Sequence, residues 1–429
     1  MAIIYYGGIA LRTLILITNL FLVILLVGCS KETSNSFSKD SHITLNIGYI
    51  NEDQFKKRFD SLLSSEFPNI RFNVVSTKPL FNPSITPSQF IQDNQVDLML
   101  IHPNRIQEFI NEGLLTDIEP LIARDQLDLN QFVPSIIELT RSYGNGKIYG
   151  LPLNFNGRVI VYNKDLFDEF KVDYPKDRMT WEDILRLANK FSISESSHSE
   201  LKGITLNSAN LLDLIQLIGN TEGLQVYNSK QQQVSINGQR WIAVWEDVIE
   251  ANKMKSLDLN VDLNTYLAPF QSGQRAMAVI TYDEYKKLEQ ENPTFRWSTV
   301  TMPINPSEPD RTRSLQISDF FAISNSSNQK EAGWEILKFL NSEVIARWEY
   351  RSDYGFSTLQ NQLVTNDSYK DLVAPFYKLS PNLVEFDQLP VELQDRIRPI
   401  SVEIMDGNIS LSEGLDLMQK EAEGDRNVN

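Results

Sequence analysis

The chain has 429 residues, of which 41% are hydrophobic, 10% aromatic and 22% charged. This composition is too apolar for a disordered protein, and the length allows two or three folded domains. The formal net charge of −16 disfavours nucleic acid as a partner, because that binding depends on Lys and Arg side chains that neutralise phosphates. The same charge weighs against an acidic ligand.

The first residues form a segment of their own. An apolar run follows Arg12 and ends at Val27, which predicts a signal peptide over residues 1–28, although the run is close to the length of a membrane-spanning helix. Small residues directly precede Cys29, and Leu26-Val27-Gly28-Cys29 resembles the lipobox of bacterial lipoproteins. That resemblance implies cleavage before Cys29 and acylation of its sulfur, which would anchor the exported chain to the outer face of the cell membrane.

Cys29 is the single cysteine of the chain, so no intramolecular disulfide is expected. Several acyl chains on Cys29 would hold the protein stably at a membrane, whereas one chain alone would bind marginally. Residues 29–42 are rich in serine and poor in apolar side chains, which predicts a flexible tether between the lipid and the folded part.

The next segment alternates strand and helix patterns. Apolar residues recur at every second position in the strands, and Phe55 and Phe59 stand at helical spacing between the first two. This succession predicts an open α/β sheet, in which ligands bind beyond the carboxyl ends of the strands. His102 and Asn104 directly follow the third strand and are therefore candidate ligand contacts. The three predicted strands cover residues 42–50, 71–77 and 95–101.

The stretch from Tyr143 to Tyr162, YGNGKIYGLPLNFNGRVIVY, places glycines among apolar and aromatic residues. A phosphate-binding loop would need glycine at position 141 ahead of Gly146-Lys147, and Arg141 stands there instead. Asn145-Gly146 is typical of a type I′ turn, which predicts a β-hairpin at this point.

The rest of the chain continues the alternation of helices and strands. Thr180, with Asp183 three residues later, predicts a capped helix start. Helices are predicted at 104–123, 180–191, 209–219, 238–254, 329–350 and in the C-terminal region, and strands at the beginning of 157–170 and within 201–208, 268–281, 295–305 and 315–325.

Motifs for catalysis and metal binding are missing. The chain has no G-x-S-x-G elbow, and its three histidines are scattered, so no zinc site is predicted. Residues 258–264 alternate oxygen ligands but lack the central glycine and the closing glutamate of a calcium loop. We therefore predict no cofactor and no metal. A facing pair of catalytic carboxylates is not identifiable among 56 acidic residues, so a secreted hydrolase stays as an alternative.

Six segments in order resemble the family 1 extracellular solute-binding proteins, which are lipoprotein receptors of bacterial ABC importers for carbohydrates and similar solutes. One is NGKIYGLPLNFNGRVIVYNKDLF, similar to the family pattern G-K-x-Y-G-(L/I)-P … Y-N-K-(D/E)-L-F. The others are VDLMLIHPNRIQEFINEGLLTDIEPLI, MTWEDILRLANK, FQSGQRAMAVI, EAGWEILKFLNSE and MDGNISLSEGLDLM. The family often has G-x-x-P after its late helix, whereas this chain has Ser357 and Thr358 where proline is expected, which leaves the ligand contacts of that loop open.

The resemblance implies two α/β lobes, each a sheet flanked by helices as in periplasmic binding proteins, with a hinge and a ligand cleft between them. Matching segments assign 43–152 plus 279–320 to lobe 1 and 153–278 plus 321–429 to lobe 2. Gly150 and Pro152 are expected to mark the hinge, because glycine gives backbone freedom and proline fixes φ.

Candidate ligand contacts are polar and aromatic residues at the predicted strand ends, since aromatic faces cover sugar C–H surfaces while amides and carboxylates bond hydroxyls. The helix that begins near Asn210 adds exposed N–H groups. The candidates are His102, Asn104, Asn154, Phe155, Asn156, Asn210, Tyr282, Asp283, Ser318, Asp319, Tyr354 and Phe356.

The resemblance implies a monomeric receptor that captures a mono- or oligosaccharide and presents it to the membrane subunits of an ABC importer. A glycan-acting or peptide-acting hydrolase and a ligand-sensing subunit of a membrane signalling system are the alternatives. Two converging ionisable groups would favour the hydrolase, and the sequence does not separate transport from sensing.

Overall fold

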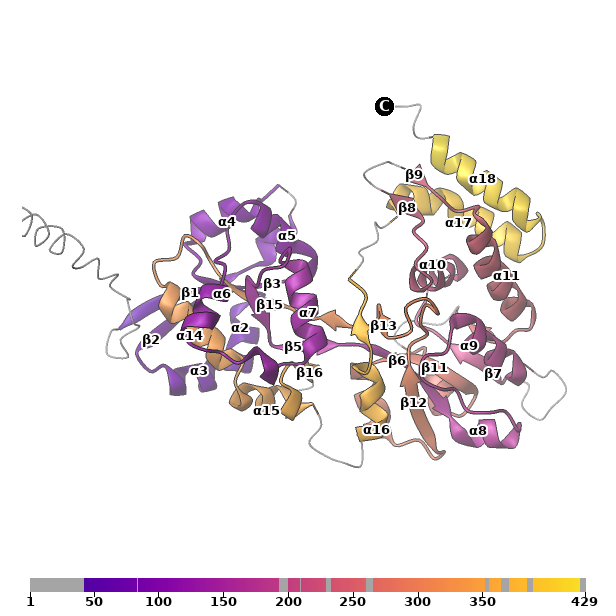
Figure 1. Ribbon diagram of the computed structural model, residues 1–429, viewed down its shortest axis with the longest axis horizontal. Coiled ribbons are helices and arrows are strands. Elements are labelled where there is room, and N and C mark those ends of the chain that lie inside the picture. The colour runs from indigo at the N-terminus through magenta and orange to yellow at the C-terminus, as the bar shows by residue number, and fades with distance from the viewer. Residues whose placement is uncertain are drawn as a thin grey trace, which may run out of the picture.

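A computed structural model describes residues 42–82, 84–192, 200–208, 210–228, 233–259, 265–351, 355–363, 370–383 and 389–424. The predicted signal peptide, Cys29 and nearly all of the tether lie outside these residues, as do Tyr354 and most of the calcium-like loop. No helix in the described ranges is both long and apolar enough to cross a membrane. The described residues form two α/β lobes that meet at a narrow waist (Figure 1).

The first lobe is built on a five-stranded sheet with the order β2-β1-β3-β15-β4. Strand β1 runs parallel to β2 and β3, whereas β15 runs antiparallel to β3 and to β4. The strands are β1 (Ile43–Tyr49), β2 (Ile70–Ser76), β3 (Leu98–Ile101), β4 (Gly150–Pro152) and β15 (Phe320–Ile323).

Helices cover both faces of this sheet, and the alternation of side chains along the strands determines which helix each residue meets. Leu98 and Phe321 lie in a core with α2, α3 and α14, whereas Met99 and Phe320 lie in a core with α4, α5 and α7. The helices are α2 (Glu52–Phe55), a π-helix (Lys56–Asp60), α3 (Ser61–Glu66), α4 (Pro87–Asn94), α5 (Pro103–Asn111), α6 (Glu119–Arg124), α7 (Pro134–Tyr143), α14 (Lys330–Leu340) and α15 (Glu343–Arg351).

The second lobe has a sheet with the order β10-β7-β11-β6-β12. Strand β7 is parallel to β10 and β11, and β6 is antiparallel to β11 and β12. The strands are β6 (Arg158–Asn163), β7 (Lys202–Thr205), β10 (Leu257–Asp258), β11 (Arg275–Thr281) and β12 (Trp297–Thr301), with a small hairpin of β8 (Tyr227–Asn228) and β9 (Gln233–Val234).

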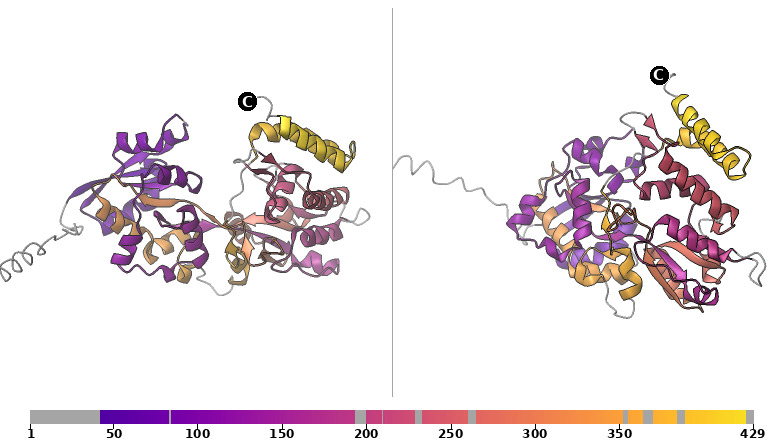
Figure 2. Two further views of the ribbon diagram at one scale, coloured as in Figure 1. Left: turned by 45° about the horizontal axis from the view of Figure 1, so that its top comes forward. Right: turned by 45° about the vertical axis from the view of Figure 1, so that its right-hand side comes forward.

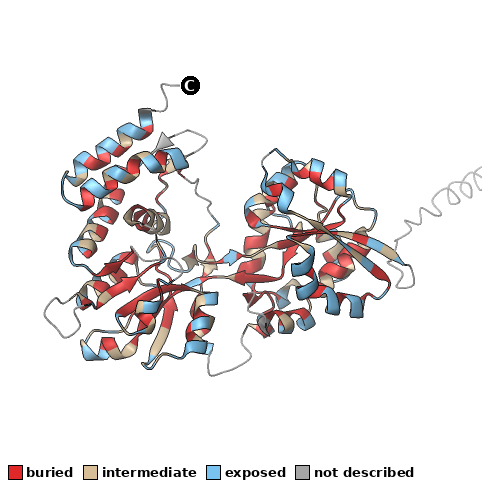
Figure 3. Cartoon of the chain, turned by 180° about the vertical axis from the view of Figure 1, so that it is seen from behind, coloured by how far each residue is buried: buried red, intermediate tan, exposed pale blue. Residues whose placement is uncertain are grey.

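Helices surround this second sheet, and the buried strands of both lobes are seen in Figure 3. Trp181 of α9 and Trp245 of α11 are fully buried in its core, as expected for tryptophans at helical core positions. Thr180 and Asp183 form the predicted reciprocal capping box. The helices are α8 (Lys164–Glu169), α9 (Trp181–Ala188), α10 (Leu211–Thr221), α11 (Gln239–Lys253), α12 (Ala268–Gln271), α13 (Tyr282–Glu291), α16 (Lys370–Val373), α17 (Val391–Met405) and α18 (Leu411–Gly424).

The lobes are joined by a three-stranded antiparallel sheet, which we call the hinge sheet. Its order is β14-β5-β16, from β5 (Asn154–Asn156), β14 (Gln316–Ile317) and β16 (Phe356–Ser357). Strand β5 leads from the first lobe to the second, β14 leads back, and β16 leads to the second lobe again (Figure 2). Beside it β13 (Arg311–Thr312) pairs with β17 (Ser380–Pro381).

The sheets divide the chain differently from the predicted boundaries of 43–152 plus 279–320 and 153–278 plus 321–429. Strand β12 pairs with β6, so most of 279–320 belongs to the second lobe. Strand β15 pairs with β3 and α14 packs on it, so the residues after 320 return to the first lobe as far as α15. Strand pairing joins residues far apart in sequence, and motif order does not reveal it.

Two expectations about the glycine-rich stretch were wrong. Residues 134–143 form a helix, and Asn145 and Gly146, with φ of 52° and 95°, turn its C-terminus while the Gly146 N–H donates to the Arg141 carbonyl at 2.8 Å. There is no hairpin here. Gly150 and Pro152 lie inside β4 and not at the crossing; a Cβ on Gly150 would sit 2.5 Å from the Phe321 carbonyl oxygen, so this glycine permits close strand contact.

Candidate functional site

The strand register brings the carboxyl ends of both sheets to the waist. In the first lobe, Phe320 at the start of β15 pairs with Ile101 and with Pro152, the last residues of β3 and β4. In the second lobe, Arg158 at the start of β6 pairs with Thr281, the last residue of β11. Only β5 separates these two edges along the chain. A cleft at the carboxyl ends of the strands is therefore expected next to the hinge sheet.

The first lobe presents several of the predicted contacts at this edge. His102 and Asn104 are exposed, and His102 caps α5 by accepting the Asn104 backbone N–H on its Nδ1 at 3.3 Å. Ser318 and Asp319 are half-buried just before β15. Burial raises the pKa of Asp319 to about 6, and the charge of Arg58 opposes that shift. These four residues lie at the same edge of the first sheet, and their contact with a ligand stays a prediction.

A buried ion pair between Arg58 and Glu349 lies near the same edge of the first lobe. The guanidinium of Arg58 makes two contacts with the carboxylate of Glu349, one of them from Nε to Oε1 at 2.9 Å. Arg58 also donates to the Tyr49 hydroxyl at 3.3 Å. The amide of Asn154 donates to Glu349 Oε2 at 3.1 Å, and Asn154 is only 3% exposed. Asn154, predicted as a ligand contact, instead ties the hinge strand β5 to the first lobe.

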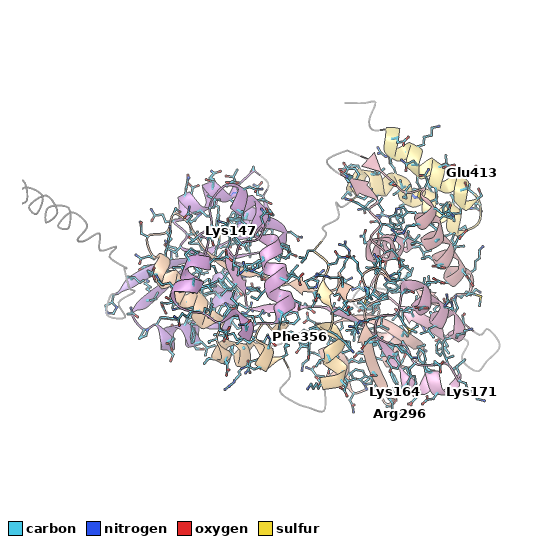
Figure 4. The ribbon with its side chains drawn as sticks, in the orientation of Figure 1. Lys147, Lys164, Lys171, Arg296, Phe356 and Glu413 are labelled. Atoms are coloured by element: carbon cyan, nitrogen blue, oxygen red, sulfur yellow. The ribbon has the colours of Figure 1, made fainter. Side chains whose placement is uncertain are left out.

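Three predicted aromatic contacts lie in the interior of the hinge. Phe155, Tyr282 and Phe356 are each at most 3% exposed. The Phe356 ring packs at a tilt against Phe155 and Tyr282, with centroid distances of 5.3 and 3.9 Å, and Phe356 lies at the waist (Figure 4). Phe155 and Phe356 lie on one face of the hinge sheet and share a core with Tyr282, so these aromatic rings pack inside the protein and do not line a surface.

The other described residues that were predicted as ligand contacts are Asn156, Asn210 and Asp283, which belong to the second lobe or to the crossing that leads into it. Asn156 is half-buried, and its Oδ1 accepts the backbone N–H groups of Gly157 and Tyr282 at 2.8 and 3.2 Å. Asn210 caps α10 by accepting the Asp213 N–H at 3.0 Å, as the helix-start prediction implied. Asp283 is exposed in the first turn of α13.

The loop with Ser357 and Thr358 in place of proline also belongs to the hinge. Both residues are buried, and the Thr358 hydroxyl donates to the Pro152 carbonyl at 3.3 Å. The Val133 N–H donates to the Thr358 carbonyl at 2.8 Å. These bonds tie the third crossing to the first lobe, so in this structure Thr358 is not open to the cleft.

A hollow that the sequence reasoning missed lies at the carboxyl edge of the second sheet, and we call it the arginine hollow. It has a volume of about 50 Å³ and contains two arginines, Arg158 at the start of β6 and Arg313 after β13. The run Arg311-Thr312-Arg313 in an acidic chain was an available signal. The lining residues are Arg158, Leu217, Thr221, Met302, Pro303, Thr312, Arg313, Ser314 and Gln316.

Within the described ranges, no group of three or more His, Cys, Asp or Glu side chains is arranged to hold a metal ion. The cleft edges carry hydroxyls, amides and separate charged groups. This chemistry suits hydrogen bonding to a polar solute.

Curated proteins that the chain resembles include sugar-binding proteins. A multiple sugar-binding protein of Streptococcus mutans is 24% identical over 297 residues, 65% of this chain and 66% of the relative. An arabinooligosaccharide-binding protein of Bacillus subtilis is 26% identical over 180 residues, 41% of this chain and 40% of the relative. Each of these matches spans less than two thirds of the relative's length.

Solved structures share the two-lobed fold. A family 1 extracellular solute-binding protein from Alicyclobacillus acidocaldarius matches with a TM-score of 0.69 and 15% identity, over 89% of this chain and 98% of that one. The sugar-binding protein MalE from Xanthomonas citri matches with a TM-score of 0.66 and 14% identity, over 90% and 98%. The model of the bacterial extracellular solute-binding protein family matches residues 52–346, so the chain belongs to that family.

Proposed function

We propose that this protein captures a saccharide or a similar polyhydroxylated solute between its two lobes and delivers it to the membrane subunits of an ABC importer. One observation carries the proposal: in a member of this family, the carboxyl ends of both sheets meet above a hinge of three strands. Relatives named for sugars and arabino-oligosaccharides favour this solute class over others.

Capture works through closure of the lobes about the hinge sheet. A solute held by one edge alone makes half of its contacts, and the closed state adds those of the other edge, so solute shifts the population toward closure. Closure requires changes in backbone dihedral angles at few residues, because the three crossing strands are short. His102, Asn104, Ser318 and Asp319 would contact solute from the first lobe, and Asn156, Asn210 and Asp283 from the second.

Thermal stability and shape together test this function. Mono- and oligosaccharides, polyols, polyamines and peptides are screened by thermal shift, since a ligand at 100 times its Kd stabilises the folded state by about 2.7 kcal/mol. We expect a saccharide or polyol to raise the Tm and to reduce the radius of gyration in small-angle scattering. Stabilisation by peptides or polyamines alone, or saccharide binding without compaction, would contradict the proposal.

We also propose that the protein works as a monomer anchored to the outer face of the cell membrane by lipid on Cys29. The lipobox-like residues before Cys29 and the Ser-rich tether support this attachment. Cells that express Cys29→Ser should incorporate no labelled palmitate into the protein, whereas the parent chain should be labelled and found with membranes. Equal labelling of the two proteins would show that Cys29 is not the lipid site.

A further inference from the structure

The arginine hollow has an unusual charge for this protein. Its lining contains Arg158 and Arg313 and no carboxylate, although the whole chain has a net charge of −16. Arg158 is exposed, and no side-chain hydrogen bond or ion pair joins its guanidinium to any residue that the structure describes. A positive hollow in an acidic protein raises the local concentration of anions at the point where it opens.

Other arginines of the second lobe are neutralised by carboxylates. Arg311 donates to Glu138 of α7 at 2.5 Å, Arg178 pairs with Asp310 at 2.8 Å, and Arg296 pairs with two aspartates. Arg158 differs from these three although it stands on the same lobe. Among the residues that the structure describes, Arg158 therefore lacks a carboxylate partner because of its place at the cleft edge, and not because acidic residues are scarce in this lobe.

Arg313 is the second cation of the hollow. Its side chain is half-buried, and burial lowers the pKa of this guanidinium, while the charge of Glu308 opposes the shift. Glu308 also accepts a hydrogen bond from the Asn382 amide at 3.0 Å. An anion in the hollow would add a charge-assisted interaction to this half-buried guanidinium.

The hollow has the size and the position of a subsite. The hollow is small, about 50 Å³, which suits one compact charged group such as a carboxylate or a phosphate. Gln316, an exposed residue of the hinge strand β14, contributes its amide to the wall. A ligand could thus place one charged group in the hollow while its hydroxylated part lies in the cleft.

We propose that the captured solute is an anionic saccharide, whose carboxylate or phosphate group is bound by Arg158 and Arg313 in the arginine hollow. The inference rests on the proposed function and names its solute class. Guanidinium groups bind both kinds of anion through paired, charge-assisted hydrogen bonds. The local charge at the cleft thus outweighs the net charge of the chain, which by itself weighs against an acidic ligand.

Matched pairs of probes test the proposal by isothermal titration calorimetry of the purified protein. Glucuronate and glucose 6-phosphate are each compared with glucose, and digalacturonate is compared with lactose. We expect at least one anionic probe to bind tenfold or more tightly than its neutral counterpart, and this preference to weaken as salt is added. Preference for the carboxylates or for the phosphate identifies which anion the solute carries.

Variants connect the preference to the hollow. Arg158→Gln and Arg313→Gln should each weaken binding of the preferred anion at least tenfold and leave neutral saccharides within about threefold. Arg71→Gln, at an exposed position on β2 of the first lobe, removes the same charge far from the cleft and should change neither. Circular dichroism confirms that each variant is folded, and Arg158 is exposed, so its replacement is well tolerated.

The outcomes separate this inference from the proposed function. Equal or tighter binding of the neutral probes, or unchanged anion binding by Arg158→Gln, would overturn the anionic class, while compaction with a neutral saccharide would still support solute capture. Failure of all five probes to bind would count against both.

Discussion

The two edges of the cleft use arginine in opposite ways. In the first lobe, Arg58 is 9% exposed and its charge is matched by Glu349, which is 2% exposed and also holds the hinge strand through Asn154. In the second lobe, Arg158 is exposed and no described carboxylate pairs with it. The comparison teaches that an arginine at a cleft edge stabilises the fold when a carboxylate of the protein pairs with it. An arginine without such a partner is available to bind a ligand.

The largest expected effect tests the internal pair. Glu349→Leu leaves the buried guanidinium of Arg58 without its partner and should destabilise the protein by about 3–5 kcal/mol in urea unfolding. The double variant Arg58→Met with Glu349→Leu should recover most of that loss, since no buried charge remains.

The matched control is Glu343→Gln on the same helix, where an exposed pair with Arg347 predicts a change of about 0.5 kcal/mol or less. A loss below about 1 kcal/mol in Glu349→Leu would show that the first edge does not depend on this pair.

The hinge comes next in expected effect. Phe155→Ala removes a fully buried ring that packs against Phe356, and Phe-to-Ala changes in cores cost about 3–5 kcal/mol. Phe81→Ala, at a position 78% exposed, serves as the control and should change stability by about 0.5 kcal/mol or less. If both variants melted alike, the hinge aromatics would not be a packed core.

The predicted contact Asp319 gives a pH-dependent effect of intermediate size. Its pKa is about 6 in the folded protein and about 3.9 when unfolded, so the folded state binds the proton more tightly. Between these values wild-type stability falls as pH rises, and the penalty is constant above pH 6.

Asp319→Asn removes that penalty and should stabilise the protein at pH 8 on the order of 1–3 kcal/mol, with little change at pH 3.5. The measurement is urea unfolding of both proteins across this pH range. A difference that does not vary with pH would show that Asp319 ionises normally.

Helix caps give the smallest expected difference between the lobes. Thr180→Ala breaks a reciprocal capping box in the second lobe and should cost about 1 kcal/mol, whereas Thr86 caps α4 of the first lobe through one bond to Gln89. Thr86→Ala should therefore cost less than Thr180→Ala in thermal melts. The reverse order would contradict the role given to the capping box.

Local patterns predicted much of this fold and less of its site. The Thr180–Asp183 cap and the α/β alternation were visible because they depend on residues close in sequence. The assignment of β12 and β15 to their sheets was not, because strand pairing is decided by contacts across the whole chain. The same reason explains why Asn154 was predicted to face the ligand: its partner Glu349 lies 195 residues away.

Aromatic residues misled for a related reason. Phe155, Tyr282 and Phe356 stand at strand ends, where an aromatic side chain suits a sugar face as well as a packed core. Only the three-dimensional arrangement shows that these three rings are buried in a common core. The positive charge of the arginine hollow was missed because the reasoning used the net charge of the chain, which does not report how charge is distributed locally.

The central claim is that the two lobes close around a solute, and a distance between the lobes tests it most directly. Spin labels are placed at exposed positions on α4 (Asp93→Cys) and on α18 (Glu413→Cys, labelled in Figure 4), one on each lobe. Cys29→Ser removes the native thiol. Pulsed electron–electron double resonance is then recorded with and without the saccharide that raises the Tm most. The account predicts a shorter and narrower distance distribution with solute; an unchanged distribution at saturation would contradict it.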